Sequence, residues 1–206
     1  WGAATGIVPG EGKGRSLGIG LILASIPIVI IGLTLGQTVK ALLFNDIAIA
    51  IGLSVGGLII IWVEKNPPVV RAQEVDDLTI KDAVWIGLIQ VLSLIPGTSR
   101  SGATIIGAMM LGVSRKAATE FSFFLGIPVI VGAGLLDLYQ SYHVFQGAAD
   151  WAVIAVGLLV SFISALILIR VLVAYVAKRD FMIFAWYRIA SGLVILLFAF
   201  TGWKLW

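Results

Sequence analysis

PGTSRSGAT, residues 96–104, separates two apolar runs at residues 83–95 and 103–113. Each run is at most about 20 Å long as a helix, whereas a transmembrane helix has to cross about 30 Å of hydrocarbon. One proline and two glycines interrupt the backbone, and irregular backbone at membrane depth is tolerated only where protein or a water-filled cavity covers it. The spacing therefore predicts a re-entrant helix-loop-helix hairpin over residues 83–113. The alternative is one spanning helix with a kink at Pro96.

The composition places the chain in a membrane. Of the 206 residues, 60% are hydrophobic and 12% are charged, whereas about 25% of the residues in a soluble domain are charged. The net charge of +3 is small and scattered, which does not favour a nucleic-acid partner. The absence of cysteine excludes disulfides and thiolate metal sites. We interpret residues 1–206 as a single transmembrane domain of the all-α class, a polytopic membrane helical bundle.

Five long apolar runs predict the spanning helices. They cover residues 17–39, 47–63, 121–138, 151–169 and 181–203. Lys and Arg gather in the loops near residues 13–15, 115–116 and 170–179, and the positive-inside rule makes that side cytoplasmic. The tip of the hairpin then points toward the outer face of the membrane.

Two local patterns refine this arrangement. Gly52 and Gly56 match the small-xxx-small pattern that lets membrane helices approach closely. The polar segment 64–82 reads as an exposed loop, and Thr79 followed by Asp82 fits a loose capping box that starts the next helix.

The tip combines groups that suit an anion. Arg100 carries a planar fork that matches phosphate oxygens, and a buried arginine in a membrane is usually functional. The helix over residues 103–113 begins at the tip, so its free amides and positive dipole end face the same place. Gly97 and Gly102 let the backbone approach a ligand closely. Hydroxyl donors are supplied by Ser99, Ser101 and Thr104. The alternative is a capped helix break whose arginine pairs with a buried acid.

Four further polar side chains lie in or beside apolar runs. Gln90 either lines the pocket or bonds a neighbouring helix, and Glu120 fits a position at the membrane interface. Arg188 in the last span is a site candidate, and its alternative is snorkelling to the interface. His143 is the single histidine, and its polar loop does not favour a catalytic role.

Residues 90–128 closely resemble the undecaprenyl-diphosphate phosphatase family, also called bacitracin-resistance proteins. The matching segments are Gln90, PGTSRSGAT at 96–104, GVSR at 112–115, ATEFSF at 118–123 and IP at 127–128. Tyr187 and Arg188 also resemble the last helix of that family. The similarity runs from about residue 18 to the C-terminus.

The resemblance implies an enzyme of the bacterial inner membrane that removes the terminal phosphate of undecaprenyl diphosphate and so recycles the lipid carrier of peptidoglycan synthesis. Its site opens to the extracytoplasmic side, and its fold contains inverted repeats with re-entrant hairpins. By resemblance Arg100 binds the diphosphate. The groups placed around it are the catalytic candidates Ser99, Ser101 and Thr104, the phosphate-binding candidates Gly97, Thr98, Gly102 and Ala103, and a supporting layer of Gln90, Glu120 and Arg188.

One part of the family pattern does not occur here. The first repeat of the family carries Glu-x-x-x-Glu followed by Pro-x-Ser-Ser-Thr-Gly-His, and this sequence has neither. The family associates those acids with a divalent cation, Mg²⁺ or Ca²⁺. We therefore expect no metal ligands within this chain, and we expect it to be the C-terminal portion of a longer protein whose N-terminal part supplies them.

Other functions fit parts of the pattern. Broken helices that face an anion also occur in transporters, so a flippase for a lipid diphosphate is one alternative, and a catalytically incomplete fragment is another. A phosphatidate-phosphatase type of enzyme is disfavoured because Ile106 stands where that family requires histidine. The expected partners are the membrane and a polyprenyl diphosphate, with a homodimer as a further option and no nucleic acid.

Overall fold

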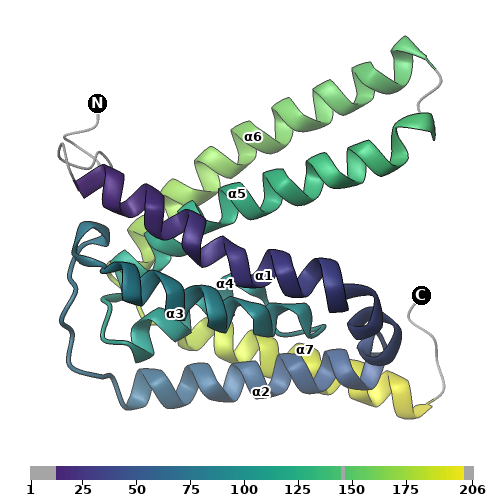
Figure 1. Ribbon diagram of the computed structural model, residues 1–206. Coiled ribbons are helices and arrows are strands. Elements are labelled where there is room, and N and C mark those ends of the chain that lie inside the picture. Colours follow the sequence, from purple (N-terminus) through teal and green to yellow (C-terminus); the bar gives the residue numbers. More distant parts are fainter. Residues whose placement is uncertain (1–12, 145–146, 202–206) are drawn as a thin grey trace.

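The computed structural model describes residues 13–144 and 147–201, and these residues form helices without any named strand (Figure 1). The helices are α1 Lys13–Leu43, α2 Asp46–Lys65, α3 Ile80–Gln90, α4 Arg100–Met110, α5 Arg115–Ser141, α6 Ala148–Val176 and α7 Met182–Thr201. Short 3-10 turns cover Val75–Asp77 (η1), Val91–Leu94 (η2) and Tyr142–Val144 (η3). The all-α prediction is confirmed.

Five of these helices are long and apolar enough to cross a membrane: α1, α2, α5, α6 and α7. They contain the first four predicted spans, while α7 begins at Met182, one residue after the predicted start at 181, and the prediction for residues 202–203 lies outside the described residues. Helix α5 begins at Arg115, ahead of the uncharged run, because the Ser114 hydroxyl accepts a hydrogen bond from Ala117 N at 3.2 Å and caps it there. A polytopic membrane protein is therefore what the chain forms.

The hairpin has the predicted form of two short helices around a break, but its second helix starts at Arg100 and ends at Met110, three residues ahead of the predicted 103–113, because the Ser99 hydroxyl caps it there. Helices α3 and α4 have 11 residues each, and they pack against each other. Helix α2 lies along α7, α1 covers α3, and α4 also packs on α5. This places the hairpin inside the bundle, where neighbouring helices cover the irregular backbone at Pro96 and the glycines.

Helices α5 and α6 project together away from the other helices over their far halves (Figure 1). The apolar window of α6 has no buried residue, and its side chains Val153, Leu158 and Phe162 are exposed. The buried core lies instead around the hairpin and the first half of α5, where Ile86, Phe121 and Leu125 are at most 1% exposed. Exposed apolar surface of this kind suits contact with lipid.

The segment between α2 and α3 is tied to the base of the hairpin. Arg71 Nε donates to the carbonyl of Leu111 at 2.8 Å, and Ala72 forms an isolated parallel bridge with Val113. The Thr79 hydroxyl accepts from Asp82 N at 3.2 Å while Asp82 Oδ2 accepts from Thr79 N at 3.0 Å. The capping box that the sequence predicts is confirmed.

Candidate functional site

The break between α3 and α4 is built by three residues with restricted or unusual backbone. Pro96 favours an extended residue before it, and Ile95 has ψ 121°. Gly97 has φ +85°, and a side chain there would collide with the carbonyl of Ile49 on α2. Ser99 has φ +64°, the one positive φ of a non-glycine residue in the part of the chain that the structure describes. Strained backbone of this type is frequent at functional sites.

Helix α4 starts at the break with its first turn partly satisfied. The Ser99 hydroxyl accepts from Gly102 N at 3.2 Å, and the Ser99 carbonyl accepts from Ala103 N at 3.0 Å. The amides of Gly102 and Ala103 are therefore engaged in the cap. The amides of Arg100 and Ser101 have no acceptor within the described ranges, so both can meet an anion.

The guanidinium of Arg100 lies against α5. A Cβ built on Gly126 would stand 2.6 Å from Arg100 Nη2 and 2.8 Å from Nη1, so the absence of a side chain at position 126 makes the space. Arg100 Nη1 is buried and has no hydrogen-bond partner. The ion pairs Arg71–Asp82, Arg115–Glu64 and Lys116–Glu74 do not involve Arg100, so the arginine of the helix break is not the one that a buried acid neutralises.

The hydroxyl candidates differ in their availability. Ser99 is exposed and Ser101 is half-buried, and their Oγ atoms lie 3.5 Å apart. Thr104 is 1% exposed, and its Oγ1 bonds the Arg100 carbonyl at 3.0 Å and Ser122 Oγ at 2.5 Å. Ser99 and Ser101 are thus placed to meet a ligand, and Thr104 fastens α4 to α5.

Arg188 reaches the break from α7. It is 7% exposed, and its Nη2 donates to the carbonyls of Gly97 at 2.9 Å, Thr98 at 3.0 Å and Gly52 at 3.2 Å. The alternative of snorkelling to the interface is therefore excluded for this side chain.

The two other supporting candidates lie inside the bundle. Gln90 is fully buried, and neither atom of its amide has a partner. Glu120 is 5% exposed, and its Oε2 has no partner. Glu120 belongs to the first turns of α5, toward the base of the hairpin, one helical turn after Lys116. The structure thus does not bring Glu120 to the tip with Arg100.

An apolar groove runs from the break along α4. Its volume is about 380 Å³, and it lies between α2, the α3–η2 region and α4. Ile59, Trp62, Ile106 and Met110 line its length, and Thr98, Gly102 and Arg188 close the end at the tip. A groove that is apolar along its length and polar at one end suits an amphiphilic lipid.

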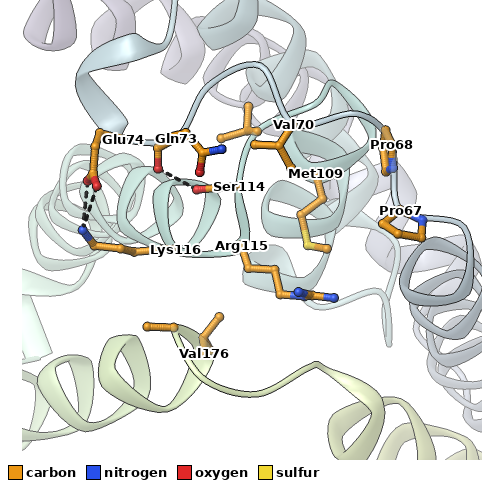
Figure 2. Close-up of a pocket in the computed structure, with 12 residues that line it drawn as sticks. Pro67, Pro68, Val70, Gln73, Glu74, Met109, Ser114, Arg115, Lys116 and Val176 are labelled. Carbon is orange, nitrogen blue, oxygen red and sulfur yellow. Dashed lines mark hydrogen bonds and ion pairs between the residues drawn. The ribbon is translucent and has the colours of Figure 1, made fainter.

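A second pocket, of about 310 Å³, lies at the opposite end of α4 (Figure 2). Lys116 is paired there with Glu74 at 2.9 Å, and the Ser114 hydroxyl donates to the Gln73 carbonyl at 2.7 Å. Arg115, which also lines it, is paired with Glu64. Because its cations are already paired, this pocket is a weaker anion site than the tip.

Within residues 13–144 and 147–201, no group of three or more His, Cys, Asp or Glu side chains could hold a metal ion. The polar groups around Arg100 and Arg188 are hydroxyls, amides and backbone carbonyls, whose donor set lacks the carboxylates that Mg²⁺ and Ca²⁺ prefer. The described residues therefore do not fit a resident divalent cation.

The site also includes residues that the sequence analysis did not single out. Ser122 and Gly126, spaced by one helical turn on α5, face Thr104 and Arg100 respectively. The signal for them is a small residue every four positions beside the resembling motif ATEFSF, which marks a helix face open to close approach.

Comparisons with known proteins agree with the resemblance. The family model described as bacitracin resistance protein BacA matches residues 3–194. The chain is 77% identical over 206 residues to a protein of Acinetobacter baylyi named undecaprenyl-diphosphatase 1. The matched region covers all of this chain and 75% of that protein. It is 54% identical over 203 residues to the undecaprenyl-diphosphatase of Psychrobacter cryohalolentis, covering 97% of this chain and 72% of the relative.

Proposed function

The chain belongs to the bacitracin resistance protein BacA family, and we propose that it hydrolyses the terminal phosphate of undecaprenyl diphosphate at the tip of the α3–α4 hairpin. The reaction recycles the lipid carrier of peptidoglycan synthesis. The name undecaprenyl-diphosphatase is that of relatives 77% and 54% identical to this chain. The proposal adds the place of the reaction and the roles of the residues there.

The observation that carries the proposed site is the buried, unpartnered Nη1 of Arg100 at the first turn of α4. A buried cation without an acceptor is unfavourable, and an anion that accepts from it removes that penalty. Phosphate oxygens match the guanidinium fork, and the positive end of α4 adds to the attraction. The Ser101 amide lies in the same first turn of α4 as Arg100 and offers a further donor to the anion.

In hydrolysis the oxygen of one water molecule ends bonded to the terminal phosphorus, the bond from that phosphorus to the bridging oxygen breaks, and inorganic phosphate and the polyprenyl monophosphate are released. Phosphoryl transfer depends mainly on positioning and on stabilisation of charge. In our proposal Arg100 and the Ser101 amide hold oxygens of the transferred phosphoryl group, and the hydroxyls of Ser99 and Ser101 bond the remaining ones.

The apolar groove beside the tip is the place we propose for the first isoprene units of the lipid. Ile106 and Met110 offer contacts along α4, and Thr98 marks the polar end. Lipid already solvates a prenyl chain, so the groove gains little affinity from burial and serves to orient the diphosphate toward Arg100.

The location within the cell is also part of the proposal. The helices make the chain a multi-pass membrane protein. An extracytoplasmic opening of the tip is supported by the basic residues Arg71, Arg115 and Lys116 at the opposite end of the hairpin. The inner membrane is proposed from membership of the family. A homodimer and a requirement for Mg²⁺ or Ca²⁺ stay predictions.

The test is release of inorganic phosphate from farnesyl diphosphate by the purified protein in detergent, in the presence of Mg²⁺ or Ca²⁺. We expect Arg100→Ala to lower kcat/KM by about 10³-fold, the loss typical of a removed charge-stabilising donor. The matched control is Arg179→Ala, which removes an exposed arginine after α6. Near-normal phosphate release by Arg100→Ala would remove this residue from the site, and binding of the diphosphate without release would favour a transporter.

A further inference from the structure

We propose that Arg188 is a positioning residue that clamps the helix break against α2, and that it acts through the tip rather than on the substrate. The expected change in phosphate release rests on the proposed function. The expected change in the mobility of the tip does not, because it depends only on how the break is held.

The break leaves backbone carbonyls that no helix satisfies. The last carbonyls before a helix break lack partners within the helix, and at membrane depth no bulk water replaces them. The carbonyls of Gly97 and Thr98 belong to the break itself, and Arg188 Nη2 donates to both, at 2.9 and 3.0 Å. The same atom bonds the carbonyl of Gly52 on α2 at 3.2 Å. One nitrogen therefore joins α7, α2 and the tip.

Glycines on α2 make room for this clamp. A Cβ on Gly52 would stand 2.5 Å from the Pro96 carbonyl oxygen, and a Cβ on Gly56 would collide with the Arg188 guanidinium. On the other side of the guanidinium, a Cβ on Gly102 would stand 3.1 Å from Arg188 Nη1. The helix break thus packs against α2 at Gly52, and the Arg188 guanidinium packs against the same helix at Gly56.

Helix α7 approaches α2 closely enough to deliver the arginine. A Cβ on Gly57 would stand 2.8 Å from the Ala185 carbonyl oxygen of α7. A Cβ on Gly192 of α7 would stand 2.8 Å from the Ala50 carbonyl oxygen of α2. Arg188 lies on α7 between Ala185 and Gly192. The close packing of α7 on α2 therefore positions Arg188 independently of its contacts with the tip.

The two arginines of the site therefore differ in what they can still bind. Arg188 Nη2 already faces three carbonyl acceptors, although Arg188 Nε has none. Arg100 makes no side-chain hydrogen bond to any described residue, and its buried Nη1 has no partner. Arg188 therefore binds the backbone carbonyls of the break, and Arg100 is the arginine available to an anion.

The chemistry of the clamp makes a distinguishing substitution available. All three contacts converge on one nitrogen, and a lysine ammonium carries three donors on one nitrogen. Arg188→Lys should therefore retain the clamp, whereas Arg188→Gln should lose it. Arg100→Lys should not restore the function of Arg100, because a diphosphate uses the planar fork of the guanidinium.

The experiment uses a spin label on the tip. The chain has no cysteine, so Ile95→Cys gives a single labelling position beside the break, on a side chain that is 38% exposed and outside the groove. The label spectrum in detergent is compared between this background and its combinations with Arg188→Gln, Arg188→Lys and Arg100→Gln. We expect Arg188→Gln to mobilise the label and Arg188→Lys to keep it immobilised. The matched control Arg100→Gln should leave the spectrum of the background unchanged.

Kinetics with farnesyl diphosphate supply the second readout. We expect Arg188→Gln to lower kcat by about 100-fold through misplacement of Arg100, with a smaller change in KM, and Arg188→Lys to recover most of that loss. An unchanged label spectrum in Arg188→Gln would overturn the proposal whatever the activity. Failure of Arg188→Lys to restore the immobilised label would overturn it too. If Arg188→Gln mobilises the label but the Ile95→Cys background releases no phosphate, the result contradicts the proposed function and leaves the clamp intact.

Discussion

Gly126 has no side chain, and the Arg100 guanidinium occupies the space beside it. A Cβ at position 126 would stand 2.6 Å from Arg100 Nη2 and 3.1 Å from Cζ. Two residues farther along the same helix turn, Pro128 continues the resembling motif, while Gly132 and Gly134 have nothing within 4 Å of the Cβ position. The position of the Arg100 guanidinium therefore depends on the absence of a side chain at Gly126 of α5.

We expect Gly126→Ala to lower phosphate release by about 10- to 100-fold, because the methyl group displaces the guanidinium by a fraction of an ångström or more. Alanine favours a helix over glycine by about 1 kcal/mol, so the melting temperature should not fall through loss of helix propensity. Gly134→Ala on the same helix is the matched control, since nothing crowds that position. Equal activities of the two variants would show that Arg100 does not depend on the space at Gly126.

At the scale of elements, the segment between α2 and α3 locks the base of the hairpin. Arg71 Nη1 donates to Asp82 Oδ2 at 3.1 Å, and the Thr79 hydroxyl and amide donate to the same carboxylate at 2.7 and 3.0 Å. Burial alone would raise the pKa of Asp82, but the hydrogen bonds from Arg71 and Thr79 outweigh it and hold this pKa below its usual value. The folded protein therefore favours the charged carboxylate at the start of α3.

A carboxylate whose pKa is lowered by folding adds stability above its unfolded pKa of about 4, and this stability is lost as the pH falls through the folded value. We expect the melting temperature, followed by tryptophan fluorescence in detergent, to fall below about pH 4. Asp82→Asn should lower it by about 4 °C at pH 7 and weaken its dependence on acid. The control is Asp137→Asn, an exposed aspartate of α5. An unchanged acid dependence in Asp82→Asn would contradict this account.

At the scale of the whole molecule, the hairpin separates two chemically different ends. The tip has the Arg100 and Arg188 guanidinium groups among hydroxyls and carbonyls. The base has paired cations, and the buried Glu64 there bonds Arg115 and accepts from Phe181 N at 3.0 Å, which joins α2, α5 and α7. The base cations Arg71, Arg115 and Lys116 are each paired with a carboxylate, whereas Arg100 at the tip has no side-chain acceptor among the described residues, so the tip is the end better suited to an anion.

Cysteine labelling can test the proposed orientation, since the natural sequence contains no cysteine. Phe44→Cys, 71% exposed between α1 and α2 on the side of the tip, should react with a membrane-impermeant maleimide in intact spheroplasts. Val69→Cys, 91% exposed at the base, should react only after the membrane is permeabilised. The two positions are controls for each other, and the reverse pattern would place the tip on the cytoplasmic side.

Hydropathy and local chain geometry determined much of the fold. Uncharged runs long enough to cross a bilayer correspond to α1, α2, α5, α6 and α7, because the cost of burying charge in lipid acts along each segment independently. Pro96 and Gly97 mark the helix break, and the Thr79–Asp82 pair marks the start of α3, since both depend on neighbours in the chain. The family pattern also named Arg100 and its hydroxyl neighbours.

Packing between distant segments decided how those residues are used. Arg188 meets Gly97 across 91 residues and Gly52 across 136. The close approach of Arg100 to Gly126 and the bond between Thr104 and Ser122 likewise join α4 to α5. From the sequence alone, Arg188 was a site candidate with snorkelling to the interface as its alternative, because local patterns carry no record of which helix faces which. Only the tertiary arrangement distinguishes an arginine enclosed by carbonyls from one whose guanidinium is free to bind an anion.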